Sequence, residues 1–186
     1  VGWIASDEDF MQRFDKLSYL KVRGSYGVVG NYNIGDYNHL ATVGTSNYVF
    51  NGSITAGRAL SRIGNSELTW ETTKSVDAGL DIGLFNDRVF LVYDYYWKTT
   101  DGLLYQIDIP YSAGFGDIQS NIGEFRFWGH ELNIETRNLT GEFKWNTSLN
   151  LSFNKNKAIK LGTNNTPIGG NNNQEDYNRT EVGKPL

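Results

Sequence analysis

The sequence contains no cysteine, which excludes a disulfide, a thiolate nucleophile and a cysteine-based zinc site. It has no basic run, and a net charge of −4 argues against a nucleic-acid partner. No stretch approaches the roughly 18 apolar residues that a transmembrane helix requires. No secretory signal opens the chain, and from this we expect a fragment of a longer protein.

Catalytic signatures are scarce as well. No serine lies in a G-x-S-x-G context, and the glycines between Gly24 and Gly30 lack the G-x-G-x-x-G spacing. The two histidines stand alone, His39 in an expected loop and His130 near an expected strand end, and for both we expect polar surface roles. The sequence therefore predicts neither an enzyme nor a cofactor.

Alternating apolar and polar side chains are abundant, in five segments of about ten residues. A period of two is typical of β-strands. The clearest pair flanks Asn86 and Asp87, two side chains that tolerate the positive φ of a tight hairpin turn. The register that aligns the apolar faces pairs Val76 with Trp97, Leu80 with Tyr93, Leu84 with Val89, and Gly83 with Phe90.

A second hairpin is predicted around Asn138–Gly141. More than one register keeps its apolar faces matched. Charge favours a four-residue loop, which sets Arg137 opposite Glu142 and Glu135 opposite Lys144, each pair worth a few tenths of a kcal/mol. A fifth strand is predicted near residues 20–28.

The connections are unequal in length. Both turns named above are tight, whereas residues 31–69, 101–121 and 155 onward form long connections rich in Gly, Asn, Ser and Thr, with residues 164–173 close to low complexity. Short turns on one rim and long loops on the other are typical of outer-membrane barrels, whose strands need only about 9 to 11 residues to cross. We therefore predict an all-β fold: antiparallel up-and-down strands, about five to six, from an incomplete transmembrane β-barrel.

Four motifs resemble the barrel of SusC/RagA-type TonB-linked outer-membrane proteins of Bacteroidota. They are W-E-T-T-K at residues 70–74, F-N-x-R at 85–88, D-Y-Y-x-K-T-T at 94–100 and F-N-K-N-K at 153–157. The segment EVGKPL at 181–186 is similar to the stretch that precedes the next strand in that family. The resemblance covers essentially the whole chain.

This resemblance implies that residues 1–186 are part of a TonB-dependent receptor β-barrel domain in the bacterial outer membrane, without its plug and most of its strands. The intact protein would have about 22 strands around a plug. It would import oligosaccharides or peptides with a SusD-like surface lipoprotein, drawing energy from the TonB complex through the plug. Outer-membrane lipid would surround the barrel.

Polar positions on the predicted strands give the candidate site. The expected lumen-facing residues are Lys21, Arg23, Asp77, Asp81, Asp94, Tyr96, Glu131 and Glu135. Paired carboxylates are also a feature of glycosidases, but strand alternation beside a water-filled lumen explains every one of them. Lys21 and Arg23 are expected to contact the plug, and charge reversal at Arg23 is expected to reduce transport.

Aromatic residues make up 14% of the chain. Trp70, Tyr95, Trp97 and Trp145 are expected in girdles at the two membrane interfaces. Candidate ligand-stacking residues in the loops are Tyr37, Tyr48, Tyr105 and Tyr111, with Tyr32, Phe115 and Tyr177 as further loop aromatics. For these loop residues, packing within their own loops is an equally good interpretation.

The alternative function is a soluble all-β carbohydrate-binding module, for which aromatics and Asn-rich loops would suffice. The two hypotheses differ in where the apolar faces point. A soluble sandwich buries Leu80, Tyr93 and Leu149 under a second layer, whereas a barrel exposes them to lipid. The sequence does not distinguish glycan from peptide cargo.

Overall fold

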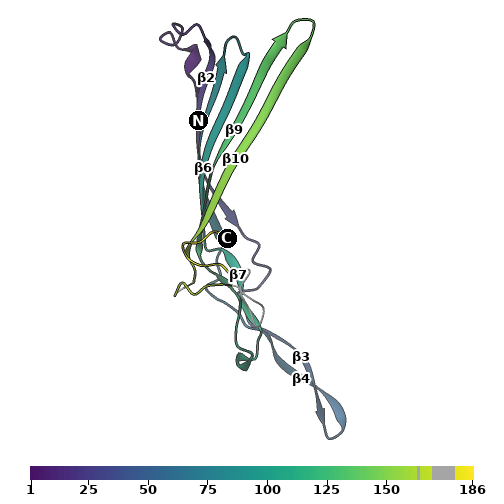
Figure 1. The fold of residues 1–186 in the computed structure, drawn as a ribbon. Coiled ribbons are helices and arrows are strands. Elements are labelled where there is room, and N and C mark those ends of the chain that lie inside the picture. Colours follow the sequence, from purple (N-terminus) through teal and green to yellow (C-terminus); the bar gives the residue numbers. More distant parts are fainter. Residues whose placement is uncertain (163, 169–178) are drawn as a thin grey trace.

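One open sheet of six antiparallel strands forms the body of the molecule in a computed structural model, which describes residues 1–162, 164–168 and 179–186 (Figure 1). In spatial order its strands are β1 (Gly2–Ile4), β2 (Leu17–Asn31), β5 (Glu71–Leu84), β6 (Val89–Asp101), β9 (Glu124–Thr140) and β10 (Lys144–Lys160). Each neighbour in the sheet is antiparallel. The predicted incomplete, up-and-down, all-β fold is confirmed.

Two further hairpins lie within the long connections. They consist of β3 (Thr42–Phe50) with β4 (Ser53–Arg62), and β7 (Leu104–Asp108) with β8 (Asp117–Asn121). Short 3-10 turns occur at η1 (Ala5–Asp7) and η2 (Tyr111–Ala113). Within the described part of the chain, no helix is long and apolar enough to cross a membrane.

The first predicted hairpin has the expected register. Leu80 lies opposite Tyr93 and Gly83 opposite Phe90, and the other two predicted pairs also form. The turn adopts positive φ at Asn86 and Asp87, as predicted, but the left-handed conformation begins one residue earlier, at Phe85. Strand pairing therefore ends at Leu84 and Val89.

The predicted register of the second hairpin is wrong. Lys144 pairs with Thr140, and Glu135 lies opposite Ser148, so the Glu135–Lys144 charge pair does not form. The Arg137–Glu142 pair is also wrong, because Arg137 lies opposite Asn146. Residues 141–143 make the turn, a shorter loop than predicted.

The cause is a bulge at Asn138, where the register shifts. Its side-chain amide donates to Oγ1 of Thr147 at 2.7 Å and its Oδ1 accepts from Oγ1 of Thr136 at 3.1 Å. Each such hydrogen bond contributes about 1 kcal/mol, more than a solvated cross-strand charge pair. The bulge therefore sets the register and the charges do not.

The strands also extend further toward the long loops than predicted. β9 begins at Glu124, before the predicted start at His130, and β10 continues to Lys160. Residues 169–173, half of the Asn-rich stretch, and Tyr177 lie outside the described residues. The small core sits at this end of the sheet, where Phe125, Ala158 and Leu161 pack together.

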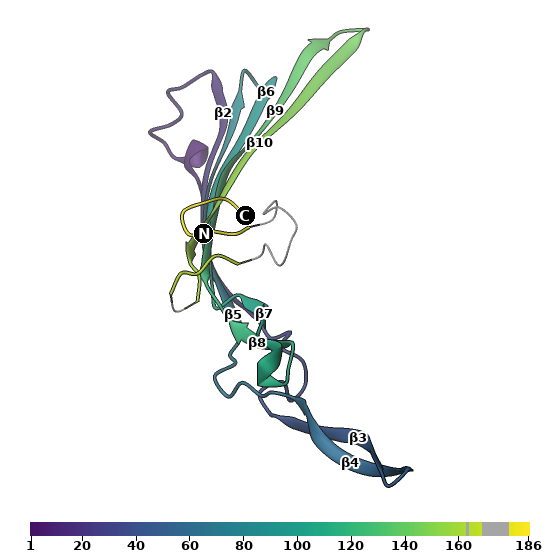
Figure 2. The ribbon, with the colours of Figure 1, turned by 60° about the horizontal axis from the view of Figure 1, so that its bottom comes forward.

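The middle of the apolar face is uncovered. Figures 1 and 2 show one layer of long strands, with the tight turns at one end and β3–β4 projecting beyond the other. Tyr93 is 38% and Leu149 47% exposed. Such side chains would be buried in a soluble sandwich, so the structure opposes the carbohydrate-module alternative.

Candidate functional site

All eight residues predicted to face the lumen lie on the polar face of the sheet. The strand registers place them in four cross-strand rows, because directly opposite residues share a face. Lys21 and Asp81 share one row, and Arg23, Asp94 and Glu131 share the next. Asp77 and Tyr96 share the row beyond that of Arg23, and Glu135 lies in the row beyond that of Lys21.

Arg23 holds two carboxylates from two other strands. Its Nη2 donates to Oδ1 of Asp81 at 2.7 Å and its Nε to the same oxygen at 3.0 Å. Nη2 also lies 3.0 Å from Oδ1 of Asp94. Asp81 is on β5 and Asp94 on β6, so the arginine reaches across about two strand spacings, roughly 10 Å. The polar face thus carries a three-strand ion cluster, partly shielded from solvent.

Gly79 makes room for this cluster. It lies between Arg23 and Asp94 in the same row. A Cβ at this position would come within 2.5 Å of Asp94 Oδ1 and 2.7 Å of Arg23 Cζ. A larger residue there would separate the arginine from its second carboxylate.

Tyr96 covers a second strand glycine. It lies opposite Gly129 and donates from its hydroxyl to Oδ1 of Asn154 on β10, at 2.8 Å. An aromatic ring over a strand glycine is a common way to fill the missing side chain. Asp94, Arg23 and Tyr96 therefore tie β2, β5, β6, β9 and β10 together from the polar side.

Gly129 should tolerate no side chain. A Cβ there would lie 2.8 Å from the carbonyl oxygen of Phe153 and 2.8 Å from Cε1 of Tyr96. Because a backbone oxygen cannot move aside, we expect Gly129→Ala to destabilise the intact protein by about 1–3 kcal/mol. Thermal unfolding in detergent, followed by gel mobility without boiling, measures this. Gly24→Ala is the control, because its Cβ meets nothing closer than 3.9 Å; equal stability of both variants would contradict the prediction.

One hollow of about 580 Å³ lies beside Met11, Phe14 and Leu84 at the tight-turn end, and further hollows lie on the polar face. Three hollows of about 610, 450 and 300 Å³ lie along it. Lining residues include Asp81 and Glu135 in the largest, Glu131 and Asn150 in the second, and Arg23 in the smallest. Hollows lined by charged and amide side chains suit a face that lines an aqueous bore.

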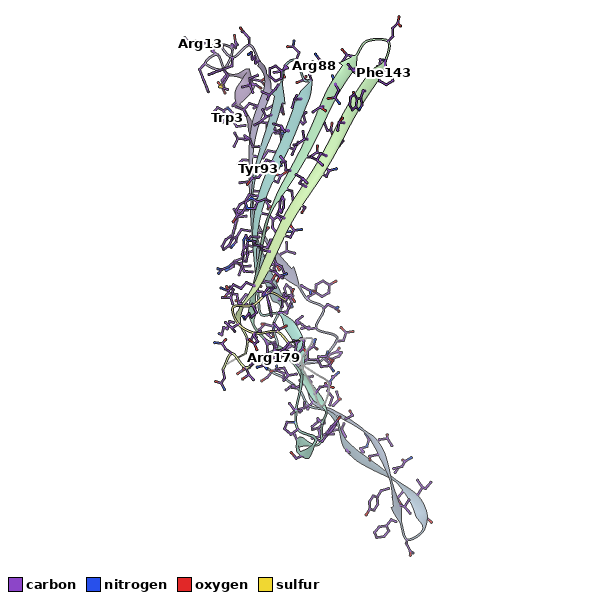
Figure 3. The ribbon with its side chains drawn as sticks, in the orientation of Figure 1. Trp3, Arg13, Arg88, Tyr93, Phe143 and Arg179 are labelled. Carbon is purple, nitrogen blue, oxygen red and sulfur yellow. The ribbon has the colours of Figure 1, made fainter. Side chains whose placement is uncertain are left out.

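Aromatic side chains gather at two levels on the opposite, apolar face. Near the long loops, Trp97 pairs with Trp128, with ring centroids 5.8 Å apart. At the tight-turn end lie Trp145, near the start of β10, and Phe143 in the turn before it, which Figure 3 labels. Ten residue steps of β10 separate Trp145 from Lys155, the residue opposite Trp128. At about 3.4 Å per residue and a 40° tilt this corresponds to a band roughly 26 Å tall.

His130 lies within this apolar band, in the middle of β9 and not near a strand end as predicted. Its Nδ1 is 2.7 Å from the hydroxyl of Tyr93, and its ring centroid is 5.0 Å from that of Tyr95. The pairing satisfies the polar atoms of two side chains on an apolar surface. His39 is exposed in a loop, as predicted. Trp70, just before β5, has its ring centroid 6.3 Å from that of Tyr32.

The long loops are joined by amide side chains, a feature that the sequence analysis missed. Asn38 donates to Oε1 of Gln119 at 2.8 Å and accepts from Nη1 of Arg62 at 2.6 Å. Asn121 donates to the carbonyl of Thr69 at 2.8 Å and accepts from its amide at 2.7 Å. The segment carrying β3–β4 is therefore bound to the segment carrying β7–β8.

The four candidate ligand-stacking tyrosines do not come together. Tyr37 adopts positive φ beside the Arg62 contact, Tyr48 lies on β3, Tyr105 on β7 and Tyr111 in η2. No ring pair among them occurs in the described residues. They do not form one binding platform within this chain.

Comparison with known proteins agrees with this geometry. The family model "TonB dependent receptor-like, beta-barrel" matches residues 13–185. TonB-dependent receptor P26 of Formosa agariphila is 40% identical over 163 residues, covering 87% of this chain and 16% of its own length. TonB-dependent receptor SusC of Bacteroides thetaiotaomicron is 34% identical over 168 residues, covering 87% of this chain and 17% of its own length. The chain thus spans about one sixth of these relatives.

Solved structures give the same result. The RagAB peptide importer in its 'closed-closed' state matches with a TM-score of 0.85 and 29% identity, covering 98% of this chain and 20% of that chain. The 'open-open' state matches with a TM-score of 0.83 and 29% identity, covering 98% and 19%.

An open sheet with an exposed apolar face, a hollowed polar face and one rim of long loops defines a segment of an outer-membrane β-barrel. The chain belongs to the TonB dependent receptor-like β-barrel family. The relatives are receptors and not enzymes, and the SusC/RagA resemblance drawn from the sequence is confirmed.

Proposed function

We propose that residues 1–186 are part of the barrel domain of a TonB-dependent importer, with a plug and further strands supplied by the rest of the intact protein. The observation that carries this proposal is the contrast between the two faces of the sheet. The apolar face exposes Tyr93 and Leu149 in a band of lipid-like height, while the face of Arg23 and Asp94 is polar and hollowed. The eight polar residues named above then face the lumen.

The polar face suits a charged plug. The Arg23 cluster has two carboxylates for one guanidinium, and Glu131 and Glu135 add negative charge on β9. A plug with complementary basic groups would dock on this face, and the TonB complex would pull on it to open a path. The barrel wall acts mechanically and performs no chemistry.

The intact protein would import oligosaccharides or peptides. One similar solved structure is a peptide importer, and oligosaccharides are the other class that the SusC/RagA resemblance implies. The contacts that choose between them lie outside this chain or in its loops, where Tyr37, Tyr48, Tyr105 and Tyr111 are available for stacking.

A SusD-like surface lipoprotein is the proposed partner at the long-loop rim. The β3–β4 hairpin projects from this rim (Figure 2) and exposes apolar side chains near its tip, among them Phe50 and Ile54. The amide contacts of Asn38 and Asn121 hold the base of this hairpin against the neighbouring loop. A loop unit anchored in this way can contact a lid without collapsing into the bore.

Uptake by the intact protein tests the proposal. A strain lacking the gene, and the same strain complemented with it, would be offered xylan and starch oligosaccharides and a tryptic digest of casein. We expect complemented cells to deplete members of one class, and a protonophore to abolish that depletion. Equal depletion by both strains, or depletion that survives the protonophore, would reject an energised importer.

The loop contacts give a separate prediction. Asn121→Ala removes hydrogen bonds to the backbone of Thr69 and Gly102, which costs about 1–3 kcal/mol locally. We therefore expect the long loops of the intact protein on whole cells to be cleaved by trypsin about tenfold faster. Asn47→Ala, on the exposed strand β3, is the matched control. Unchanged cleavage in Asn121→Ala would show that these bonds do not hold the loops.

A further inference from the structure

Basic side chains form a row across the apolar face. Lys74 on β5 lies opposite Thr99, Thr99 lies opposite Arg126 on β9, and Arg126 lies opposite Lys157 on β10. Lys155 lies two residues from Lys157 on the same face, opposite Trp128. Lys74, Arg126, Lys155 and Lys157 are called the basic row below.

Lys74, Arg126 and Lys157 lie immediately outside the aromatic level near the long loops, and Lys155 lies level with it. Trp97 and Trp128 are two residues from Thr99 and Arg126, on the same face. The Arg126 guanidinium carbon lies 5.0 Å from the centroid of the Trp97 ring. Stacking of this kind orients the guanidinium along the surface.

Little of this charge is neutralised within the chain. Among the described residues, Glu124 is the one carboxylate within ion-pair distance of the basic row, 3.5 Å from Nη2 of Arg126. Nε of Arg126 is shielded from solvent and has no hydrogen-bond partner in the described part of the chain. Lys74, Lys155 and Lys157 are exposed.

The other end of the apolar face has no such row. Where the sheet approaches the tight turns, the corresponding cross-strand row consists of Leu84, Val89, Thr136 and Thr147. Positive charge on the apolar face is thus concentrated at one interface, the one beside the long loops. General anchoring at both interfaces would not produce this asymmetry.

We propose that the basic row binds the phosphorylated headgroup of the glycolipid in the outer leaflet. The assignment rests on the proposed function in one respect, because the barrel orientation makes the long-loop interface the outer one. At that interface an aromatic level marks the boundary of the hydrocarbon, and anionic headgroups lie just beyond it. The positive charges of Lys74, Arg126 and Lys157 are opposite in sign to the phosphates and lie at the same depth.

The test uses the intact protein extracted in mild detergent, with bound lipid A quantified by mass spectrometry per mole of protein. The variant Lys74→Gln with Lys157→Gln changes two exposed side chains and spares the Arg126–Trp97 stack. We expect about a fivefold loss of retained lipid A for each positive charge removed. Lys98→Gln is the matched control, because Lys98 lies on the polar face at the same height, next to Thr99 and over the Tyr96 ring.

Equal retention of lipid A by the double variant and the wild type, or no retention by the wild type, overturns the proposal.

A second measurement distinguishes between headgroup types. It follows thermal unfolding after reconstitution into phosphatidylcholine vesicles containing either diphosphoryl lipid A or phosphatidylglycerol. We expect lipid A to raise the unfolding temperature of the wild type more than that of the double variant. A phosphatidylglycerol effect of equal size overturns the glycolipid assignment. Uptake is measured separately, so failure of import with intact lipid A retention rejects the proposed function alone.

Discussion

Replacing Leu132 by arginine in the intact protein is expected to reduce assembly of the barrel strongly. Leu132 lies on the apolar face between Tyr93 and Leu151, close to the middle of the band bounded by the two aromatic levels. An arginine facing lipid at mid-depth costs about 2–4 kcal/mol. Because total stabilities of folded proteins are only about 5–15 kcal/mol, a change of this size removes a large part of the stability and should lower the amount of assembled barrel.

The control is the neighbouring residue. Asn133→Arg places the same side chain on the polar face, near Val92 and Asn150, beside a hollow that Glu131 also lines. We expect Asn133→Arg to reach the outer membrane at close to the wild-type level. The measurement is the amount of heat-modifiable barrel in membrane fractions. Loss only in Asn133→Arg would mean that the lipid-facing and lumen-facing sides have been exchanged, and equal loss in both variants would contradict the assignment of lipid to the Leu132 face alone.

Alternation made the first hairpin predictable from the sequence. A slip of one residue would exchange every side chain between the two faces, so Leu80 opposite Tyr93 was strongly favoured over its neighbours. Turn chemistry agreed, because Asn86 and Asp87 accept positive φ. Two independent signals therefore fixed one register.

The second hairpin lacked such agreement. Its apolar faces stay matched in more than one register, so the predicted register rested on weak charge pairs. The structure instead places an extra residue, Asn138, in a bulge, a feature that no two-residue period reveals. The hairpin β3–β4 was also missed, although Asn51–Gly52, both at positive φ, is the dipeptide that most strongly favours a two-residue turn.

The polar residues of the site were identified by their face, but their grouping was not. Alternation placed Arg23, Asp81 and Asp94 on one side of the sheet and said nothing of which atoms meet. The cluster forms because Gly79, a residue without a side chain, leaves a gap between two strands through which the arginine reaches. Loop contacts such as Asn38 with Gln119 join residues 81 positions apart and leave no periodic signal.

Charge reversal at Arg23 is the second change with a large expected effect. In the wild type one guanidinium binds Asp81 at 2.7 Å and Asp94 at 3.0 Å, and Asp81 is almost completely buried. Arg23→Glu would bring three carboxylates together in a partly shielded site. Removing the partner of a buried charge costs about 3–5 kcal/mol, less where solvent screens it, so we expect a loss of about 2–4 kcal/mol in stability and reduced uptake.

A compensating double variant tests whether the balance of charges in the Arg23 cluster determines its stability. Arg23→Glu combined with Asp81→Arg restores one cation between two carboxylates and should recover much of the lost stability, measured by thermal unfolding of the intact protein in detergent. Uptake distinguishes a purely structural cluster from one that also contacts the plug. A plug partner would meet exchanged charges in the double variant, so stability would recover while uptake would not. Wild-type uptake in the single variant, with normal assembly, would show that the cluster serves neither purpose.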